Sequence, residues 1–372
     1  MQLTKTMVKK VGISMAGVLV VLGLGGCSSN KKTESTAEAN KENSTQTLEQ
    51  ITKKAKAEGQ VASVGMPDSW ANWVGTWGDI KTKYGINHTD TDMSSAEELA
   101  KFQSEGTNGT ADIGDVGISF GPLAVQKNLV QAYKTSYWKD IPSWAKDDKG
   151  YWMLSYTGTI SFMVDTKNVK NIPKTWKELA NSKYKVAIGD VTKGNQSQFA
   201  VLAAAIANGG DETNIAPGLK YFAKIAKEGR LSSVDSTMAN LEKGEIDVAV
   251  MWDFNALNYR DQVDKTRFKV EIPTDGSVMS GYTTLINKNA PHPNAAKLAR
   301  EYILSDEGQI NLAKGYARPI RSTVKLPQEV KDKLLPDSEY KSVQPLKDST
   351  AWDKTALSLP EKWQQEVLIY AK

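Results

Sequence analysis

The stretch that decides the fold of this chain is Gly244-Glu-Ile-Asp-Val-Ala-Val-Met-Trp-Asp-Phe-Asn255. Residues 246–251 are mostly apolar and β-branched and follow a glycine, a pattern typical of a short strand buried on both faces. The apolar run stops at Trp252 and Asp253, and Asn255 is a candidate N-cap of a following helix. Side chains at the carboxyl ends of strands in open α/β sheets face the ligand. Taken alone, the pattern fits equally a ligand-binding pair and a core tryptophan beside a capping aspartate.

Length and composition narrow the class of protein. The chain has 372 residues, more than one ordinary core accommodates, which suits two domains. Hydrophobic residues make up 40% and charged residues 24%, as in ordinary globular proteins. The net charge is +4, but Lys5, Lys9 and Lys10 belong to an N-terminal leader; without these three of the 47 basic residues, 44 face 43 acidic ones. This balance argues against nucleic acid as a partner, which requires a basic face.

The N-terminus has the parts of a secretory signal. A positive segment precedes an apolar run, Val11 to Gly23, which is shorter than the roughly 20 residues of a membrane span. Leu24-Gly-Gly-Cys27 follows and resembles the lipobox of bacterial lipoproteins. The resemblance implies that residues 1–26 are removed and that Cys27 becomes a lipidated first residue, anchored at the extracellular face of the membrane. Residues 27–47 are polar and predict a disordered tether. Cys27 is the only cysteine, which excludes an intrachain disulfide.

Predicted strands and helices alternate along the rest of the chain, which favours the α/β class. We expect two doubly wound lobes with a hinge, because extended segments near Met153–Val164 and Gly281–Asn287 cross between two such series. The expected boundaries are 48–158 for the first part of lobe one, 159–277 for lobe two, and 278–372 for the return to lobe one with C-terminal helices.

Three further segments carry a resemblance to a known family. Together with the lipobox, Pro173-Lys-Thr-Trp-Lys-Glu-Leu179, Gly244 to Trp252 and Asp306-Glu-Gly-Gln309 are similar to the extracellular solute-binding proteins of ABC importers. The similar branch contains polyamine, ferric-iron, thiamine and phosphonate binders. The resemblance implies a Venus-flytrap fold, capture of a small solute between the lobes, and delivery to a membrane permease with its ATPase. It implies a monomer that needs no cofactor.

In such a fold the carboxyl ends of strands from both lobes face one cleft. The candidate ligand-binding residues are therefore the polar and aromatic ones at those ends. They are Asp68, Ser69, Trp70, Asp115, Ser119, Tyr156, Thr157, Asn195, Gln196, Trp252, Asp253 and Tyr282.

Carboxylates combined with aromatic rings are typical of a site for an organic cation. The polyamine branch places a Trp with acidic neighbours after the corresponding strand, so the resemblance carries over onto Trp252 and Asp253. An amine-bearing, polyamine-like solute is therefore the leading expectation. Asn195 opens a helix, however, and helix N-termini attract phosphate, phosphonate or carboxylate groups. If both signals hold, the solute is zwitterionic, such as an aminoalkylphosphonate.

Plainer interpretations of single residues stay open. Asp68 and Asp115 fit turn residues as well as ligand contacts, and Asn195 fits a simple N-cap. Ferric binders of the family have adjacent tyrosines, and the sequence contains no Tyr-Tyr pair. A surface lipoprotein that uses the same fold as an adhesin or receptor is an alternative of another class.

Enzymatic chemistry has weak support. Gly117-Ile-Ser-Phe-Gly121 matches the spacing of a nucleophile elbow, with Ser119 as its serine. The only later histidine available as a base is His292, between two prolines, and the other histidine is His88. The sequence has no metal-ligand spacing and no Gly-rich phosphate loop. We therefore expect a binding protein, not an enzyme, with no metal.

Overall fold

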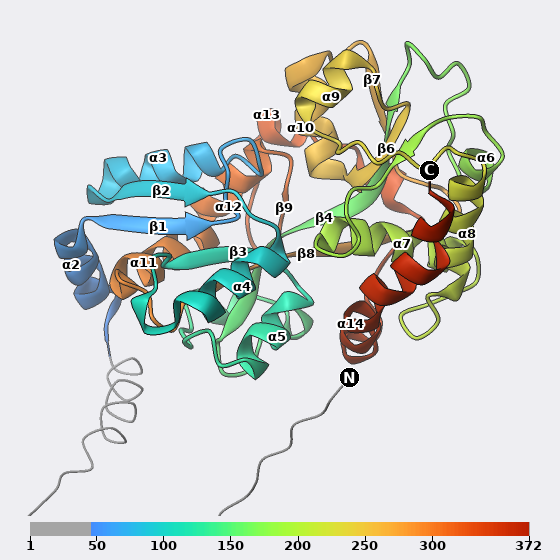
Figure 1. The fold of residues 1–372 in the computed structure, drawn as a ribbon. Coiled ribbons are helices and arrows are strands. Elements are labelled where there is room, and N and C mark those ends of the chain that lie inside the picture. Colours follow the sequence, from blue (N-terminus) through green and yellow to red (C-terminus); the bar gives the residue numbers. More distant parts are fainter. Residues whose placement is uncertain (1–45, 372) are drawn as a thin grey trace, which may run out of the picture. The chain divides into compact units, whose positions relative to one another are not determined.

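The computed structural model describes residues 46–371, so the predicted signal peptide and Cys27 lie outside the described residues. A ten-stranded sheet organises them, with seven strands in the order β2-β1-β3-β8-β4-β6-β5 and three short strands, β7, β9 and β10, paired off this path. Strand β4 (Trp152–Asp165) and strand β8 (Ser277–Ile286) pair antiparallel through the middle of the sheet and join its two halves (Figure 1). The expected crossover segments are therefore single long strands.

Lobe one is built on β1, β2 and β3: β1 pairs in parallel with β2 on one side and β3 on the other, and β3 pairs antiparallel with β8. Its strands are β1 (Gln60–Val64), β2 (Asn87–Thr91) and β3 (Ile113–Gly117). Its helices are α2 (Leu48–Glu58), α3 (Trp73–Tyr84), α4 (Ser95–Glu105), α5 (Phe120–Gln126), α11 (Pro293–Leu304) and α12 (Asp306–Lys314).

Lobe two is built on β6, which pairs antiparallel with β4 and parallel with β5. Its strands are β5 (Val186–Ala187), β6 (Val248–Trp252) and β7 (Phe268–Glu271). Its helices are α6 (Trp176–Ala180), α7 (Asn195–Ala207), α8 (Ala216–Lys227), α9 (Met238–Lys243) and α10 (Asp253–Val263). After its polar first turn, helix α7 is apolar on every side, and nearly all of it is buried, as expected of a helix enclosed by its lobe.

The last part of the chain returns along the hinge and ends on lobe two. Its elements are β9 (Arg318–Pro319), α13 (Gln328–Lys331), β10 (Val343–Pro345) and α14 (Ser349–Glu366). Strand β10 pairs with β8, and α14 packs against α8. Trp352 lies edge-on to Phe199, and Trp363 lies edge-on to Phe222. The short 3-10 helices are Gly106–Asn108, Trp138–Asp140, Ser143–Ala145, Asp337–Tyr340 and Leu368–Tyr370.

The start of α10 differs from the sequence prediction. The helix begins at Asp253, with Trp252 at the N-cap position, so Asn255 lies inside the first turn and is not the N-cap. The Asn255 side chain instead donates to Gln196 Oε1 at 3.0 Å. Strand β6 likewise starts at Val248, two residues later than predicted, and the Asp247 carboxylate before it accepts the backbone N–H of Lys185 at 2.8 Å.

Candidate ligand cleft between the lobes

A cavity of about 250 Å³ lies between the lobes at the carboxyl ends of their parallel strands. Its walls come from the loops after β1 and β2, the starts of α4 and α7, and the central strands. The lining residues are Gly65, Pro67, Trp70, Asp92, Met93, Ser94, Ser95, Glu98, Asp115, Gly194, Asn195, Gln196, Ser197 and Tyr282. Three of them are acidic and none is Lys or Arg, so the lining offers carboxylates without a side-chain cation.

Glu98 is the central carboxyl group of the lobe-one wall. It is only 1% exposed, and its Oε2 accepts the backbone N–H of Asp115 at 3.1 Å. Gly65 and Gly114 make room for it, because a Cβ added at either residue would lie 2.3 Å or 2.5 Å from a Glu98 carboxylate oxygen. Gly65 also has φ +70°, a conformation that favours glycine. The backbone is therefore shaped around this buried acid.

Asp115 lies beside Glu98 at the end of β3. Its Oδ2 accepts the Tyr156 hydroxyl at 2.6 Å, and that hydroxyl accepts the Trp70 indole N–H at 2.7 Å. Its Oδ1 is buried and makes no well-formed hydrogen bond among the described residues, although the nearby Trp73 indole N–H helps to lower the pKa of this carboxyl group. A buried carboxylate oxygen without a donor is costly unless a ligand supplies one. Asp115 thus offers an acceptor to whatever occupies the cavity.

Burial shifts the titration of both acids. Burial raises the pKa of Glu98 well above its usual range, and the charge of Asp115 adds to the rise. Burial also raises the pKa of Asp115 well above its usual range, against the hydrogen bond from Tyr156, which lowers it. Burial thus disfavours the charged form of both groups, and a cation bound beside them would stabilise that form.

Aromatic rings enclose the acids. Trp70 meets Phe254 and Tyr282 edge-on, with 5.4 Å between ring centroids in each pair. Tyr156 and Tyr282 are stacked with centroids 5.7 Å apart. Trp70 and Tyr282 reach the cavity itself. Ring faces next to carboxylates are the surroundings that hold an ammonium group.

The lobe-two wall has the opposite electrostatic character. Helix α7 starts at Asn195 with Gly194 at the N-cap position, so Asn195 is not the N-cap, and no side chain caps the helix. Asn195 is 1% exposed, and neither its Oδ1 nor its Nδ2 makes a well-formed hydrogen bond among the described residues, although its side chain lies near enough to the Tyr282 hydroxyl to influence the pKa of that group. Backbone N–H groups and the positive end of the helix dipole face the cavity at this point. This wall is suited to an anion.

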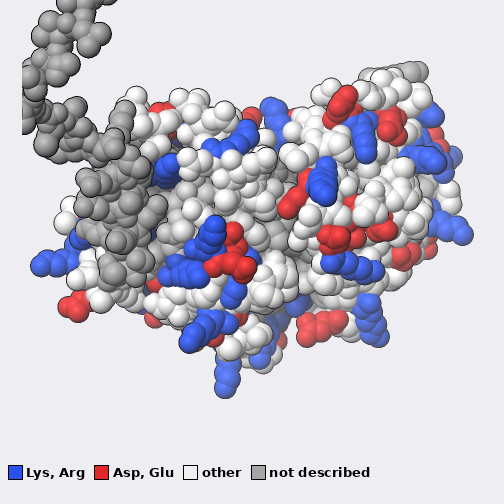
Figure 2. Space-filling view, turned by 90° about the horizontal axis from the view of Figure 1, so that it is seen from below, with Lys and Arg blue, Asp and Glu red and all other residues white. Residues whose placement is uncertain are grey.

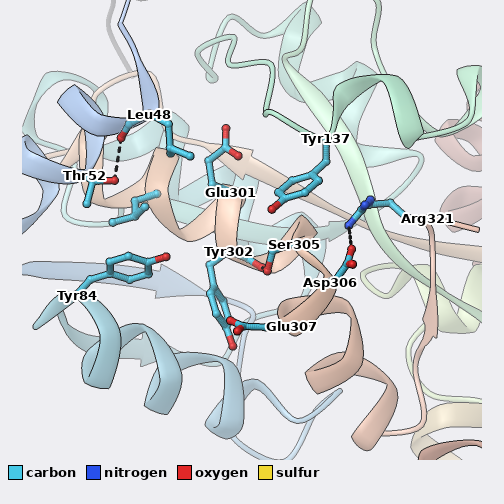
Figure 3. Close-up of a pocket in the computed structure, with 11 residues that line it drawn as sticks. Leu48, Thr52, Tyr84, Tyr137, Glu301, Tyr302, Ser305, Asp306, Glu307 and Arg321 are labelled. Atoms are coloured by element: carbon cyan, nitrogen blue, oxygen red, sulfur yellow. Dashed lines mark hydrogen bonds and ion pairs between the residues drawn. The ribbon is translucent and has the colours of Figure 1, made fainter. Parts of the chain in front are cut away.

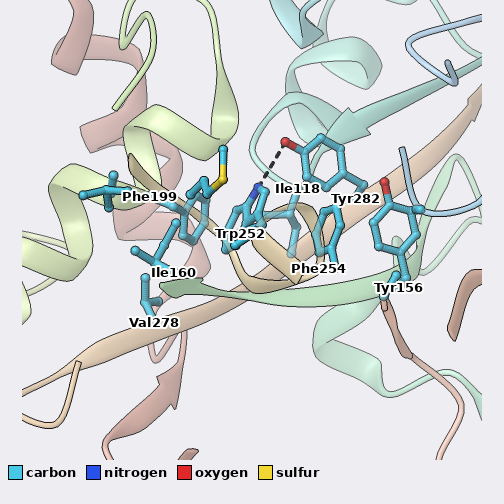
Figure 4. Packing of buried hydrophobic residues seen from close by; sticks show 14 of the residues in the cluster. Ile118, Tyr156, Ile160, Phe199, Trp252, Phe254, Val278 and Tyr282 are labelled. Carbon is cyan, nitrogen blue, oxygen red and sulfur yellow. Dashed lines mark hydrogen bonds between the residues drawn. The ribbon is translucent and has the colours of Figure 1, made fainter. Parts of the chain in front are cut away.

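Trp252 and Asp253, the pair at which the fold-deciding strand ends, do not line the cavity. Trp252 is fully buried among core residues, and its indole N–H donates to the Tyr282 hydroxyl at 3.2 Å (Figure 4). Asp253 is 1% exposed and accepts from the Thr159 N–H at 2.8 Å and the Tyr340 hydroxyl at 2.6 Å. Trp252 therefore supports the cavity wall from behind through Tyr282, whereas Asp253 serves hydrogen bonds away from the cavity.

Five of the twelve predicted site residues line the cavity: Trp70, Asp115, Asn195, Gln196 and Tyr282. Tyr156 adjoins it through its bonds to Trp70 and Asp115. Asp68 is exposed, and Ser69 presents its backbone carbonyl to Asn258 of lobe two at 2.6 Å. Thr157 lies in β4, paired with Gly281 and Arg318.

Sequence reasoning missed Glu98 and Asp92. The buried positions of α4 are Ser95, Glu98, Leu99 and Phe102, the i, i+3, i+4, i+7 face of an amphipathic helix. A glutamate on that face, within one turn of the helix start, was the available signal. Asp92 lies in an exposed stretch just before α4, and its sequence surroundings mark it only as a polar turn.

Ser119 lacks the partners of a catalytic serine. Its buried Oγ has no hydrogen-bond partner among the described residues, and it lines a separate hollow of about 110 Å³ against α14. His292 Nδ1 lies 3.0 Å from Asp112 Oδ2, and His88 stacks on Trp77 with 3.9 Å between centroids.

Within residues 46–371, no three His, Cys, Asp or Glu residues are grouped so that they could hold a metal.

A larger hollow of about 430 Å³ lies on lobe one beside α2, α11 and α12 (Figure 3). Its charged groups already have partners in the protein. Arg321 bonds to Asp140 at 3.0 Å and to Asp306 at 2.7 Å, and Glu301 accepts the Tyr133 hydroxyl at 2.6 Å. Size alone therefore does not make this hollow the ligand site.

Acidic and basic side chains are interspersed on the face shown in Figure 2, without a continuous basic patch. No helix of the described part is both long and apolar enough to cross a membrane.

The sequence of this chain matches a known protein family. The family model described as bacterial extracellular solute-binding protein matches residues 108–344. The chain belongs to this family. The prediction made from the lipobox and the three segments is thereby confirmed, as is that of a binding protein over an enzyme.

Relatives of this solute-binding protein share limited identity. The sulfate-binding protein of Escherichia coli (strain K12) is 25% identical over 171 residues, which are 44% of this chain. The match spans only about half, 52%, of that relative's length. A putative 2-aminoethylphosphonate-binding periplasmic protein of Salmonella typhimurium (strain LT2) is 23% identical over 270 residues, covering 70% of this chain and 77% of the relative.

Solved structures confirm the fold class. The periplasmic binding protein AfuA from Actinobacillus pleuropneumoniae, with fructose-6-phosphate bound, aligns with a TM-score of 0.69 and 19% identity. The alignment covers 83% of this chain and 98% of AfuA. A ferric binding protein from Campylobacter jejuni aligns with a TM-score of 0.62 and 18% identity, covering 82% and 98% of the two chains. The α/β fold with two lobes is thus that of periplasmic binding proteins.

Proposed function

We propose that this solute-binding protein captures a small zwitterion with an ammonium group and an oxyanion, such as an aminoalkylphosphonate, and delivers it to the permease and ATPase of an ABC importer. The observation that supports this most is the pairing of unlike walls in one cavity. Glu98 and Asp115 lie on lobe one, and the uncapped start of α7 with Asn195 lies on lobe two.

The ammonium group belongs on the lobe-one wall. Glu98 and Asp115 Oδ1 accept hydrogen bonds from the ammonium group, and the rings of Trp70 and Tyr282 contact the methylene groups of the solute. Charge-assisted hydrogen bonds to a desolvated carboxylate are worth about 1.5–3 kcal/mol each. A ligand cation also removes the cost of burying two acids side by side.

The oxyanion belongs at the start of α7. Backbone N–H groups of the first turn and the Asn195 Nδ2 supply donors. The interaction of the anion with the helix dipole adds about 0.3–1 kcal/mol of favourable binding free energy. The same dipole disfavours a second ammonium group. A polyamine, which carries cationic groups at both ends, therefore suits the cavity less well than a zwitterion. The relative named for 2-aminoethylphosphonate agrees with this choice.

The cellular setting follows the family and the N-terminal sequence. An extracellular solute-binding protein works outside the membrane, and we propose that Cys27 carries the lipid that keeps it there as a monomer. Cys27→Ser should release the protein from the membrane fraction into the medium. Retention of this variant in the membrane fraction would contradict a lipid anchor at Cys27.

Titration calorimetry against a graded set of solutes tests the function. We expect 2-aminoethylphosphonate to bind at least 100-fold more tightly than ethanolamine, which has only the amine, or ethylphosphonate, which has only the anion. Tighter binding of spermidine would restore the polyamine expectation. Tighter binding of sulfate or fructose 6-phosphate would show that the acidic wall does not receive an amine. No binding across the set, with thiamine included, would count against solute capture and favour an adhesin or receptor.

A further inference from the structure

Backbone strain is concentrated at one place outside the ligand cavity. Ala71, Asn72 and Tyr316 have φ of 47°, 57° and 70°, and they are three of the four non-glycine residues with positive φ in the described part of the chain. Such a conformation is unfavourable for a residue with a Cβ, least so for asparagine, and persists where surrounding contacts impose it. The three residues lie in two segments of lobe one that are far apart in sequence.

Close packing brings the two segments together. A Cβ added to Gly315 would lie 2.4 Å from both Ala71 C and Asn72 N, so the backbones touch there. The Asn72 side chain also donates to the Asn311 carbonyl at 3.0 Å. Trp70, whose ring lines the cavity, directly precedes this strained turn. The turn therefore sets the position of a ligand-contacting side chain.

The same two segments bond to lobe two. The Tyr316 hydroxyl donates to Asp261 Oδ2 at 2.6 Å, and Asn258 Nδ2 donates to the Ser69 carbonyl at 2.6 Å. Asn258 and Asp261 are three residues apart on α10, so they present neighbouring side chains to lobe one. Tyr316 is 7% exposed, and a hydrogen bond to a carboxylate at such a site is stronger than one in water.

We propose that the hydrogen bonds Tyr316–Asp261 and Ser69–Asn258 form a latch that holds the lobes closed. The strained turns at Ala71–Asn72 and Tyr316 position the lobe-one partners of these bonds. The latch lies beside the cavity and not in it, so its residues set affinity through the closure equilibrium and not through contact with solute. This role rests on the proposed solute capture, because closure matters only to a protein that encloses a ligand. Breaking the latch shifts the population toward open lobes, which lowers the apparent affinity by the same factor as the closed fraction.

Three variants of the full chain test the latch. Tyr316→Phe removes one interlobe hydroxyl, and Asn258→Ala removes the side-chain donor of the second latch bond. Tyr302→Phe is the matched control, because the Tyr302 hydroxyl also donates to a carboxylate, Asp79 Oδ2, but within lobe one. The radius of gyration is measured by small-angle X-ray scattering with no solute added, and far-ultraviolet circular dichroism checks that each variant is folded.

We expect Tyr316→Phe and Asn258→Ala each to increase the radius of gyration relative to the unaltered chain, whereas Tyr302→Phe leaves it unchanged. Affinity for 2-aminoethylphosphonate should fall about 3- to 10-fold in the two latch variants and stay constant in the control. An unchanged radius of gyration in both latch variants, or an equal increase in the control, would overturn the latch. If the unaltered chain does not bind 2-aminoethylphosphonate, the proposed ligand fails, but the scattering result still decides the latch.

Discussion

Glu98 and Asp115 share one small volume of the cleft, where the N–H of Asp115 donates to Glu98 Oε2 at 3.1 Å. Glu98 lies on α4 and Asp115 on β3, and the two residues are 17 positions apart in the sequence. Gly65 and Gly114 provide space for the Glu98 carboxyl group because they have no side chain, and the rings of Trp70 and Tyr282 lie beside the acids. Because burial alone makes this arrangement unfavourable, a cationic partner gives the most direct physical reason for it.

Glu98→Gln should weaken binding of 2-aminoethylphosphonate by roughly 10- to 100-fold, since it removes a charge-assisted hydrogen bond of about 1.5–3 kcal/mol. The same change should raise the melting temperature without solute, because a buried amide costs less than a buried carboxylate. Calorimetry and thermal unfolding measure the two effects. Glu105→Gln is the control: it lies in the same helix, bonds to Lys101 and Thr110, and should leave affinity unchanged. Equal affinity in both variants would exclude Glu98 from the site.

Asn195→Asp should abolish detectable binding of 2-aminoethylphosphonate, because it places a carboxylate where the oxyanion is expected. The fold should survive, since an acidic residue in the first turn of a helix is favourable. Binding of ethanolamine should be retained or improved, which separates loss of the oxyanion site from general damage. Undiminished affinity of Asn195→Asp for 2-aminoethylphosphonate would place the oxyanion elsewhere.

Gly117→Ala should prevent the lobes from meeting. A Cβ at Gly117, on β3 of lobe one, would lie 2.0 Å from Asn195 Cγ of lobe two. We expect at least 10-fold weaker binding and a larger radius of gyration, with lobe-one stability little changed. Gly78→Ala is the matched control, because a Cβ there meets nothing within 4 Å and alanine favours the helix. Normal binding by Gly117→Ala would show that Asn195 moves aside at little cost.

Trp252→Ala should reduce the free energy of unfolding by about 3–5 kcal/mol, as expected when a fully buried aromatic side chain is truncated. Asp253→Ala should also destabilise the protein, because it leaves the Thr159 N–H and the Tyr340 hydroxyl without their acceptor. Chemical denaturation measures both. Loss of affinity with unchanged stability would instead place this pair among the ligand contacts.

Affinity for an amine-bearing solute should rise with pH. Burial raises the pKa of Glu98 and of Asp115 in the unliganded protein, so both hold protons at pH values where ordinary carboxyl groups, with a pKa of about 4, have lost them. A bound ammonium group favours the charged forms, so binding releases protons and strengthens as pH rises toward the raised pKa values. Calorimetry of 2-aminoethylphosphonate in buffers of different ionisation enthalpy counts the protons. Glu98→Gln should release fewer, and an equal count would contradict the role of Glu98.

The stability of the unliganded protein should change in the opposite sense. An acid whose folded-state pKa is raised keeps its proton while the unfolded chain loses one. The contribution of these two acids to stability is therefore largest below the ordinary carboxyl pKa, falls as pH rises from that pKa to the raised value, and changes no further above it. Thermal unfolding across this range should show a shallower fall for Glu98→Gln.

Local patterns in the sequence were sufficient for the architecture. The apolar run before Trp252 predicted a buried strand because alternation is absent where both faces of a strand are covered. The alternation of strands and helices predicted α/β lobes, and the lipobox with three short segments predicted the family, which the match over residues 108–344 confirms. Each of these signals depends on neighbours in sequence, so one chain without coordinates carries them.

The tertiary structure alone decided which polar residues meet. Asp253 and Asp115 both lie at the carboxyl end of a strand, where ligand contacts are expected. Asp253 nevertheless bonds to Tyr340, a residue 87 positions later in the segment that follows the hinge. Glu98 gives no strand-end signal, but the packing of α4 beside β3 turns it into the cavity. Local sequence fixes the direction of a side chain relative to its own helix or strand. Whether that direction leads to a cleft or to the core depends on contacts between segments distant along the chain, and those form only when the whole chain has folded.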